Sequence, residues 1–235
     1  MKYNPEIHHR RSIRLKGYDY TQPGAYFVTF CSHQRMHVFG EVVNGEMVLN
    51  DAGKIARDEW FKTAELRPYV KLFEDEFVIM PNHGHGIIWI EDEVGTRRRR
   101  VLDWDEQRAR QHRAPTYTPT GESFGKPVKG SVPTIVRAYK SAVTYMVNAA
   151  ENQRGAVLWQ KNYYEHVIRN DRELNNIRWY ILNNPLNWQL DRDNVQNIRK
   201  LSPPENVEEY IKDVGDMVLR LKADNLRSLR KFKER

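Results

Sequence analysis

Apolar residues along this chain recur with two different spacings, and these spacings separate predicted strands from predicted helices. Short segments rich in β-branched and aromatic residues, bounded by turn residues, lie at 25–31, 70–80, 85–90 and 163–168. These segments predict strands, with Pro81-Asn82 as the turn between the second and the third. A hairpin is predicted over 40–49, because Asn44-Gly45 supplies the positive φ angles of a type I′ turn.

Three other segments carry apolar residues at the spacing of an amphipathic helix. The first spans about 51–66 and the second about 133–148. The third begins with the capping-box pattern of Asn170 and Glu173 and ends at Pro185. The sequence therefore predicts three helices interleaved with the strands.

The predicted order is strand, helix, strand, strand, helix, strand, helix, with the hairpin inserted early. This order is typical of the ferredoxin-like split βαβ arrangement, an α+β fold in which helices pack on one face of an antiparallel sheet. We expect a basic N-terminal arm over 1–22, a main domain over 23–188 and a helical, basic extension over 189–235. Within the domain, 91–130 lacks periodicity, which indicates a long inserted basic loop.

The composition is that of a soluble globular chain, with 40% hydrophobic and 29% charged residues. No apolar run approaches the roughly 20 residues of a membrane helix, so no membrane association is expected. The single cysteine, Cys31, fits a reducing compartment, and we expect a cytoplasmic, nucleoid-associated protein.

The formal net charge of +7 favours a polyanionic partner, nucleic acid before membrane. Part of this charge lies in the 91–130 loop as the run Arg97, Arg98, Arg99 and Arg100. Such a run is either a solvated loop or an arm that follows a phosphate backbone.

Two histidines two residues apart, His83 and His85, lie between two apolar runs. Residues i and i+2 of a strand share one face, so both imidazoles can grip one metal ion if the second run starts at the histidines. On spacing alone, a polar strand end with hydrogen-bonded histidines is the simpler interpretation.

Three motifs occur in register along the chain: Met-Pro-Asn-His-x-His-Gly, Trp-Gln-x-x-Tyr-Tyr-Glu-His-x-Ile-Arg-Asn, and Tyr-Ile-x-Asn-Asn-Pro. Together they resemble the IS200-like single-tyrosine transposases with a His-hydrophobic-His motif, and are most similar to the REP-associated tyrosine transposases. The resemblance covers roughly 24–188. It favours the metal site over the simpler interpretation of the histidine pair.

The resemblance implies a role for four residues. The histidine pair would bind the metal through His83 and His85, and Tyr180 would be the nucleophile. Asn184, one helical turn after Tyr180, would be the third metal ligand. Members of this family cleave single-stranded DNA beside a hairpin, form a 5′-phosphotyrosine link and release a 3′-hydroxyl. The donor set suits Mn²⁺ or Mg²⁺, and zinc would also bind.

The chain departs from the family pattern between the two histidines. That position, usually a bulky hydrophobe, is Gly84. A glycine in a strand removes a packing side chain and loosens the backbone. We therefore expect a less rigid metal site.

Each of the further candidate site residues has both a functional and a structural interpretation. Glu165 and His166 either orient a ligand imidazole or form a salt-bridged strand edge. Trp159 either stacks on an unpaired base or packs in the core. Tyr145 is the rival nucleophile, although its apolar neighbours favour packing. Two basic residues of the second long helix, Arg137 and Lys140, either line a DNA groove or lie on a solvated face of the helix.

We interpret the chain as a metal-dependent single-stranded DNA endonuclease and strand transferase acting next to hairpins of REP-like repeats. A monomer is favoured over a homodimer. One alternative is a catalytically silent, domesticated DNA- or RNA-binding regulator on the same fold. A second alternative is a replication or mobilisation nickase. A third is a metal-dependent hydrolase without a covalent step, and this hydrolase would need the metal but not Tyr180.

Overall fold

The computed structural model describes residues 18–91, 128–191 and 193–194. Their centre is an antiparallel sheet of five strands. The strand order is β4-β6-β1-β7, and β5 also pairs with β6. The strands are β1 (Gly24–Cys31), β4 (Val70–Lys71), β5 (Phe77–Met80), β6 (His83–Ile90) and β7 (Tyr164–Ile168). This order and direction confirm the predicted ferredoxin-like sheet.

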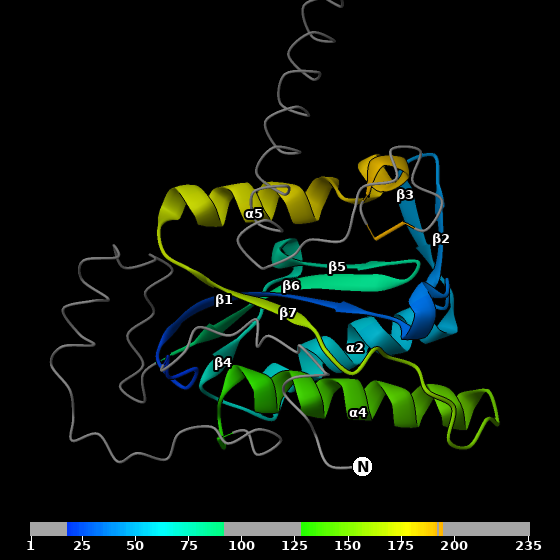
Figure 1. Cartoon of the computed structure of the whole chain (residues 1–235), viewed down its shortest axis with the longest axis horizontal. Coiled ribbons are helices and arrows are strands. Elements are labelled where there is room, and N and C mark those ends of the chain that lie inside the picture. Colours follow the sequence, from blue (N-terminus) through cyan, green and yellow to red (C-terminus); the bar gives the residue numbers. More distant parts are fainter. Residues whose placement is uncertain (1–17, 92–127, 192, 195–235) are drawn as a thin grey trace, which may run out of the picture.

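Two helices, α2 (Asp51–Glu65) and α4 (Val132–Ala150), lie on one face of the sheet (Figure 1). The core on that side contains Tyr26, Val28 and Phe30 of β1 together with apolar side chains of both helices. This pairing of two helices with one face is the predicted arrangement.

The third helix, α5 (Asp171–Asn183), covers the opposite face of the sheet (Figure 1). Its Leu174, Ile177 and Ile181 pack against side chains such as Phe27 and Ile87, which point to the other side of their strands. The expectation that all helices share one face is therefore met for α2 and α4 and not for α5. An apolar stripe specifies that a helix is buried, and it does not specify against which face.

The predicted strand over 70–80 is interrupted. β4 pairs with the end of β6, then a 3-10 turn over Glu74–Glu76 intervenes before β5 pairs with the start of β6. The turn consists of three acidic residues, and Glu76 at its end is fully buried. The interruption thus brings a carboxylate into the interior, where it meets α5.

The predicted turns and caps are present. β2 (Gly40–Val43) and β3 (Glu46–Leu49) form the hairpin, and Asn44 and Gly45 have φ angles of 52° and 81°. The Asn170 side chain accepts a hydrogen bond from the Glu173 backbone N–H at the start of α5. A 3-10 turn over Pro185–Leu190 follows α5 and returns the chain toward the sheet.

Residues 1–17, most of the predicted 91–130 loop and residues 195–235 lie outside the described part of the chain. The predicted arm, the basic loop with Arg97 to Arg100, and the helical extension therefore stay predictions. Of the helices in the described residues, none combines the length and the apolar character that spanning a membrane requires.

Candidate active site

His83 and His85 lie at the start of β6, opposite Cys31 and Thr29 of β1. Both side chains are fully buried on the face that α5 covers, and their ring centroids are 4.6 Å apart. The ring of Phe27 stacks on His85 with a centroid distance of 5.6 Å. The predicted arrangement, with both imidazoles on one face of a strand, is confirmed.

A side chain at position 84 would point to the other face of the sheet, where it would not fit. A Cβ atom at Gly84 would lie 2.5 Å from Cε2 of Phe30 and 3.0 Å from Cδ1 of Ile79. Phe30 itself packs against Trp60 and Tyr139 in the core. The expectation of lost packing beside the histidines is therefore wrong, because Phe30 fills the space that a side chain at Gly84 would occupy.

The His83 ring is oriented by Asn82. The Asn82 amide donates to the backbone carbonyls of Arg35 and Asp193, at 3.1 and 2.8 Å, so its Oδ1 faces Nδ1 of His83 at 2.8 Å. An amide oxygen only accepts, so Nδ1 is the nitrogen that donates to Asn82, and Nε2 is the ring nitrogen left for another group. This buried Nε2 has no hydrogen-bond partner among the described residues.

The His85 ring lies between Thr29 and Tyr180. Its Nδ1 is 2.8 Å from the hydroxyl of Thr29, and its Nε2 is 3.1 Å from the phenolic oxygen of Tyr180. Burial, together with the neighbouring His83, holds the pKa of His85 well below its ordinary value. We place the single proton of this neutral ring on Nδ1, so that Nε2 faces Tyr180 and His83 as an acceptor.

Tyr180 projects from α5 toward the sheet and is 4% exposed. The helix is held over the sheet by Arg178, whose guanidinium Nε donates to Glu76 at 2.8 Å. Glu76 also accepts a hydrogen bond from the indole N–H of Trp89 on β6. This buried network fixes α5 two residues before Tyr180, and it was not predicted because Glu76 was assigned to a strand.

Asn184 follows Tyr180 by one helical turn and caps α5. Its side chain is buried, and its Nδ2 donates to Oδ2 of Asp191 at 3.0 Å. Its Oδ1 has no hydrogen-bond partner among the described residues. The predicted ligand residue is therefore at the site, and its amide oxygen is available to a further group.

Asp191 is the residue that the sequence interpretation missed. The chain turns back after α5 and buries this carboxylate, with Oδ2 4.0 Å from Nε2 of His83 and 3.5 Å from the hydroxyl of Tyr180. Burial raises the pKa of Asp191, although His83 opposes the shift. The nitrogen and oxygen ligand atoms of His83, His85 and Asp191 lie within 4.8 Å of one another, so this group can hold a metal ion.

The next acidic residue, Asp193, holds the same segment in place. Its carboxylate lies 2.9 Å from the guanidinium of Arg35, and its backbone carbonyl accepts from Asn82. The signal in the sequence was the run Asp191-Arg192-Asp193-Asn194 within an otherwise basic extension. That signal has no periodicity, so only the three-dimensional return of the chain reveals it.

Glu165 and His166 make their hydrogen bonds elsewhere. They lie on β7, which pairs with β1 rather than with β6. Glu165 accepts from the hydroxyl of Tyr163, and His166 bonds to Glu173 at 2.6 Å. The expected roles in orienting the imidazoles are instead filled by Asn82 and Thr29, because β1 separates β7 from the histidine strand.

The remaining candidates lie on the α4 side of the sheet. Trp159 is 6% exposed and packs in the core against Phe30 and Phe39. Lys140 on α4 donates from its ammonium group to the backbone carbonyls of Gln160 and Asn162. Lys140 and Trp159, and also Arg137 on α4, are therefore separated from the histidine pair by the sheet.

Comparison with known proteins identifies a sequence relative and solved structures to which this chain is similar. No family model matches the sequence. The structure of a REP-associated tyrosine transposase bound to a REP hairpin has a TM-score of 0.46, 16% identity, and coverage of 74% of both chains. A proposed transposase of Deinococcus radiodurans has a TM-score of 0.37, 15% identity, and coverage of 72% of this chain and 95% of that one. Both TM-scores are below 0.5.

The sequence relative is a Haemophilus influenzae protein described as uncharacterized. It is 40% identical over 191 residues, which are 81% of this chain and 96% of that protein. The chain therefore belongs to the same protein family as this Haemophilus influenzae protein.

Proposed function

We propose that this protein is a metal-dependent single-stranded DNA endonuclease and strand transferase, of the REP-associated tyrosine transposase type, with Tyr180 as its nucleophile. One observation carries the proposal: the phenolic oxygen of Tyr180 lies 3.1 Å from His85, within a buried group of His83, His85 and Asp191. The three sequence motifs that resemble this family supply these same histidines and this tyrosine.

The donor atoms of the group fit a divalent cation. Nε2 of His83 and Oδ1 of Asn184 are buried polar atoms without a hydrogen-bond partner among the described residues, which is costly unless another group binds them. Imidazole nitrogens with carboxylate and amide oxygens suit Mn²⁺ or Mg²⁺. We propose that His83, His85 and Asp191 hold the ion, with Asn184 as a further oxygen ligand. Bound there, such an ion would neutralise a phosphate and stabilise the charge that develops on it.

The proposed cleavage step uses the Tyr180 hydroxyl. A free phenol has a pKa near 10, so the hydroxyl must lose its proton as it attacks the phosphorus atom. The bond from the phenolic oxygen to phosphorus forms and the bond from phosphorus to the 3′-oxygen breaks. The 3′-oxygen leaves as an oxyanion and becomes a hydroxyl by taking up one proton, which balances the proton that Tyr180 loses, while the 5′-phosphate stays linked to Tyr180.

The covalent link keeps the energy of the phosphodiester bond. A 3′-hydroxyl of the same or another strand can attack the phosphotyrosine, restore a phosphodiester and release the tyrosine. Strand transfer by this route needs no nucleotide cofactor. Because Tyr180 is 4% exposed, a phosphodiester reaches its hydroxyl only after part of the covering chain moves.

The experiment is a denaturing gel of the protein mixed with labelled hairpin oligonucleotides that carry single-stranded flanks, with Mn²⁺. The oligonucleotides come from repeats beside the protein's own gene. Wild type is compared with Tyr180→Phe, His83→Ala and the control Tyr69→Phe. Tyr69 precedes β4, which pairs with the far end of β6, so its hydroxyl lies away from the site.

We expect a labelled protein adduct with wild type and Tyr69→Phe, and none with Tyr180→Phe or His83→Ala. Metal-dependent cleavage that survives Tyr180→Phe would overturn the covalent mechanism in favour of a hydrolase. DNA binding on a native gel without an adduct under any metal would indicate a binding protein instead of an enzyme.

A further inference from the structure

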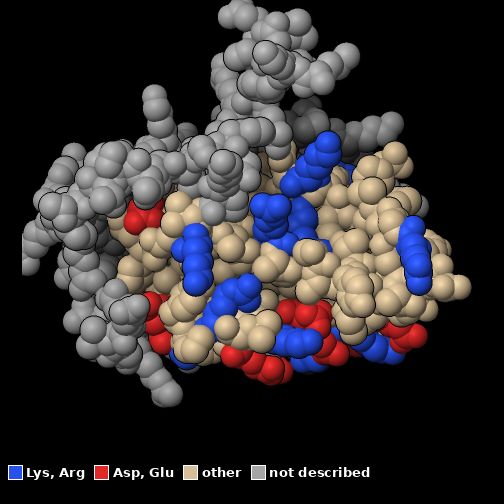
Figure 2. Space-filling view, turned by 90° about the horizontal axis from the view of Figure 1, so that it is seen from below, with Lys and Arg blue, Asp and Glu red and all other residues tan. Residues whose placement is uncertain are grey.

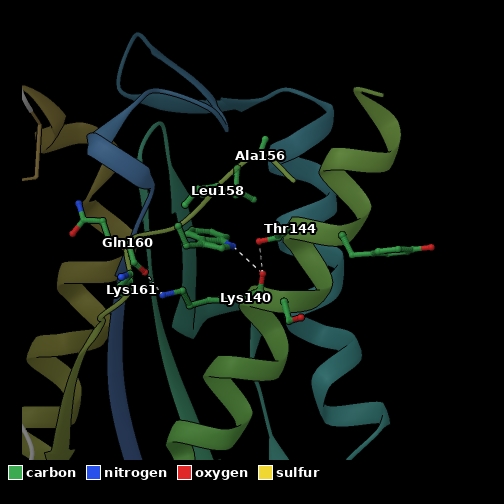
Figure 3. A pocket seen from close by; sticks show the side chains of 10 residues that line it. Lys140, Thr144, Ala156, Leu158, Gln160 and Lys161 are labelled. Carbon is green, nitrogen blue, oxygen red and sulfur yellow. Dashed lines mark hydrogen bonds between the residues drawn. The ribbon is translucent and has the colours of Figure 1, made fainter. Parts of the chain in front are cut away.

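A pocket of about 520 Å³ opens between the C-terminal half of α4 and the segment that precedes β7 (Figure 3). Its lining comes from residues 140–145 of the helix and 156–161 of the segment. This volume lies within the range of small-molecule sites in proteins. The pocket is thus large enough for a nucleotide, and nothing in the proposed cleavage chemistry uses it.

The lining combines apolar surface with positive charge. Leu158 and Trp159 are buried and form apolar wall, whereas Val157 is 61% exposed. The charged residues of the lining are Lys140 and Lys161, and none of the lining residues is acidic. The charge of the pocket is therefore complementary to an anion attached to an apolar or aromatic body.

Tyr145 contributes an exposed aromatic ring to the lining. Its apolar neighbours on the helix favour packing, but the side chain is 74% exposed. The packing interpretation is therefore wrong for this residue. The same lining contains Lys140 and Lys161, and an exposed aromatic ring combined with positive charge is typical of surfaces that bind single-stranded nucleic acids.

The wall of the pocket is fixed by hydrogen bonds. The carbonyl of Leu158 accepts from the backbone N–H of His33, just after β1, at 2.8 Å, and the N–H of Gln160 donates to the carbonyl of Cys31, the last residue of β1, at 2.9 Å. The indole N–H of Trp159 donates to the carbonyl of Lys140, and the Lys140 ammonium group donates to the carbonyl of Gln160 (Figure 3). A ligand would therefore meet a pocket that is already formed, which lowers the entropy cost of binding.

The pocket and the active site lie at the same end of β1. Cys31, which bonds to the pocket segment, is opposite His83 in the sheet. The face that carries α4 also presents several separate Lys and Arg side chains (Figure 2). A DNA strand that passes around this end of the sheet can contact both places.

We propose that this pocket binds an unpaired nucleotide of the single-stranded DNA that flanks the hairpin. Its base contacts Tyr145 and its phosphate is neutralised by Lys161. The inference rests on the proposed function for its ligand. Its test does not depend on cleavage, because binding is measured with EDTA present.

The test measures the Kd of a fluorescent hairpin with a single-stranded flank for wild type, Tyr145→Ala and Tyr145→Phe. We expect Tyr145→Ala to weaken binding about fivefold or more, and Tyr145→Phe, which keeps the ring, to stay within about twofold. A hairpin of the same stem without the flank should bind wild type and Tyr145→Ala equally. Because the side chain is exposed, these substitutions leave the core unchanged.

A second measurement locates the contact. A flank that carries 5-iodouracil is crosslinked to wild type by light, and the attached peptide is identified after trypsin digestion. We expect the peptide 141–154, whose single tyrosine is Tyr145. Crosslinks on other peptides, or equal Kd values for wild type and Tyr145→Ala on the flanked hairpin, would overturn the proposal.

The outcomes separate this proposal from the proposed function. If binding depends on Tyr145 but no covalent adduct forms, the nucleotide-binding pocket is supported and the proposed enzymatic function is contradicted. An adduct together with binding that is insensitive to Tyr145→Ala would overturn the pocket alone. A dimer of wild type that Tyr145→Ala dissociates would also overturn it, because the pocket would then join two copies of the chain.

Discussion

The phenolic oxygen of Tyr180 lies 3.1 Å from Nε2 of His85, although 95 residues separate the two along the chain. The contact joins α5 to β6, and further hydrogen bonds hold each of the two elements. The hydrogen bond from Arg178 to Glu76 holds the helix, and the hydrogen bond with Thr29 holds the imidazole of His85. Tyr180 is thereby held against a potential metal ligand, as the proposed cleavage step requires.

Asp191 is expected to contribute a charged ligand to the metal. Replacement by alanine removes a carboxylate that lies 4.0 Å from Nε2 of His83. We expect Asp191→Ala to weaken Mn²⁺ binding by about tenfold or more, measured by isothermal titration calorimetry. Asn184→Ala should have a smaller effect, because it removes a neutral donor. Wild-type affinity in Asp191→Ala would show that the ion is held by other residues.

Asn82 is expected to act on the metal through His83. Without the Asn82 amide, the proton of His83 is no longer confined to Nδ1, and the ring loses its orientation. We expect Asn82→Ala to reduce Mn²⁺ affinity by about 10- to 100-fold. Circular dichroism of the variant serves as the control for folding. An unchanged affinity in a folded Asn82→Ala protein would contradict the assigned proton position.

Gly84 is expected to be required by packing. A Cβ atom there would lie 2.5 Å from Phe30, so Gly84→Ala should lower the free energy of unfolding by roughly 1–3 kcal/mol. Urea unfolding measures this change. In a Phe30→Leu background the same substitution should cost less, because the ring that it meets is gone. Equal costs in the two backgrounds would show that Phe30 is not the constraint.

The stability of the metal-free protein should fall as the pH drops below about 6.5. The pKa of His85 is well below its ordinary value in the folded state, so in this range the unfolded chain binds a proton that the folded chain does not. The free energy of unfolding then decreases by up to about 1.4 kcal/mol per pH unit from this group. Urea unfolding with EDTA at several pH values, for wild type and His85→Gln, isolates the contribution. If the free energy of unfolding changes with pH in the same way for wild type and His85→Gln, the assigned contribution of His85 is contradicted.

Much of the architecture could be predicted because it depends on local patterns. The period of two placed both imidazoles on one face of β6, and the Asn170 and Glu173 pattern marked the start of α5. The position of Tyr180 followed from a motif resemblance and agrees with the contact to His85.

The rest depends on contacts between distant segments. Asp191 joins the site only because the chain turns back after Pro185, and no spacing in the sequence signals that return. The face that α5 covers is decided by Phe27 and Ile87 of the sheet rather than by its own stripe. The effect of Gly84 was misjudged for the same reason, since Phe30 lies on another strand.

Mass spectrometry of the protein after reaction with a hairpin oligonucleotide and Mn²⁺ tests most directly whether Tyr180 is the nucleophile. Trypsin cleaves after Arg178 and Arg192, so Tyr180 is the single tyrosine of peptide 179–192. We predict that this peptide carries a nucleotide through a phosphate linked to the phenolic oxygen. A nucleotide on the peptide of Tyr145 or of Tyr163 and Tyr164, or on no peptide at all, would contradict the assignment of Tyr180 as the nucleophile.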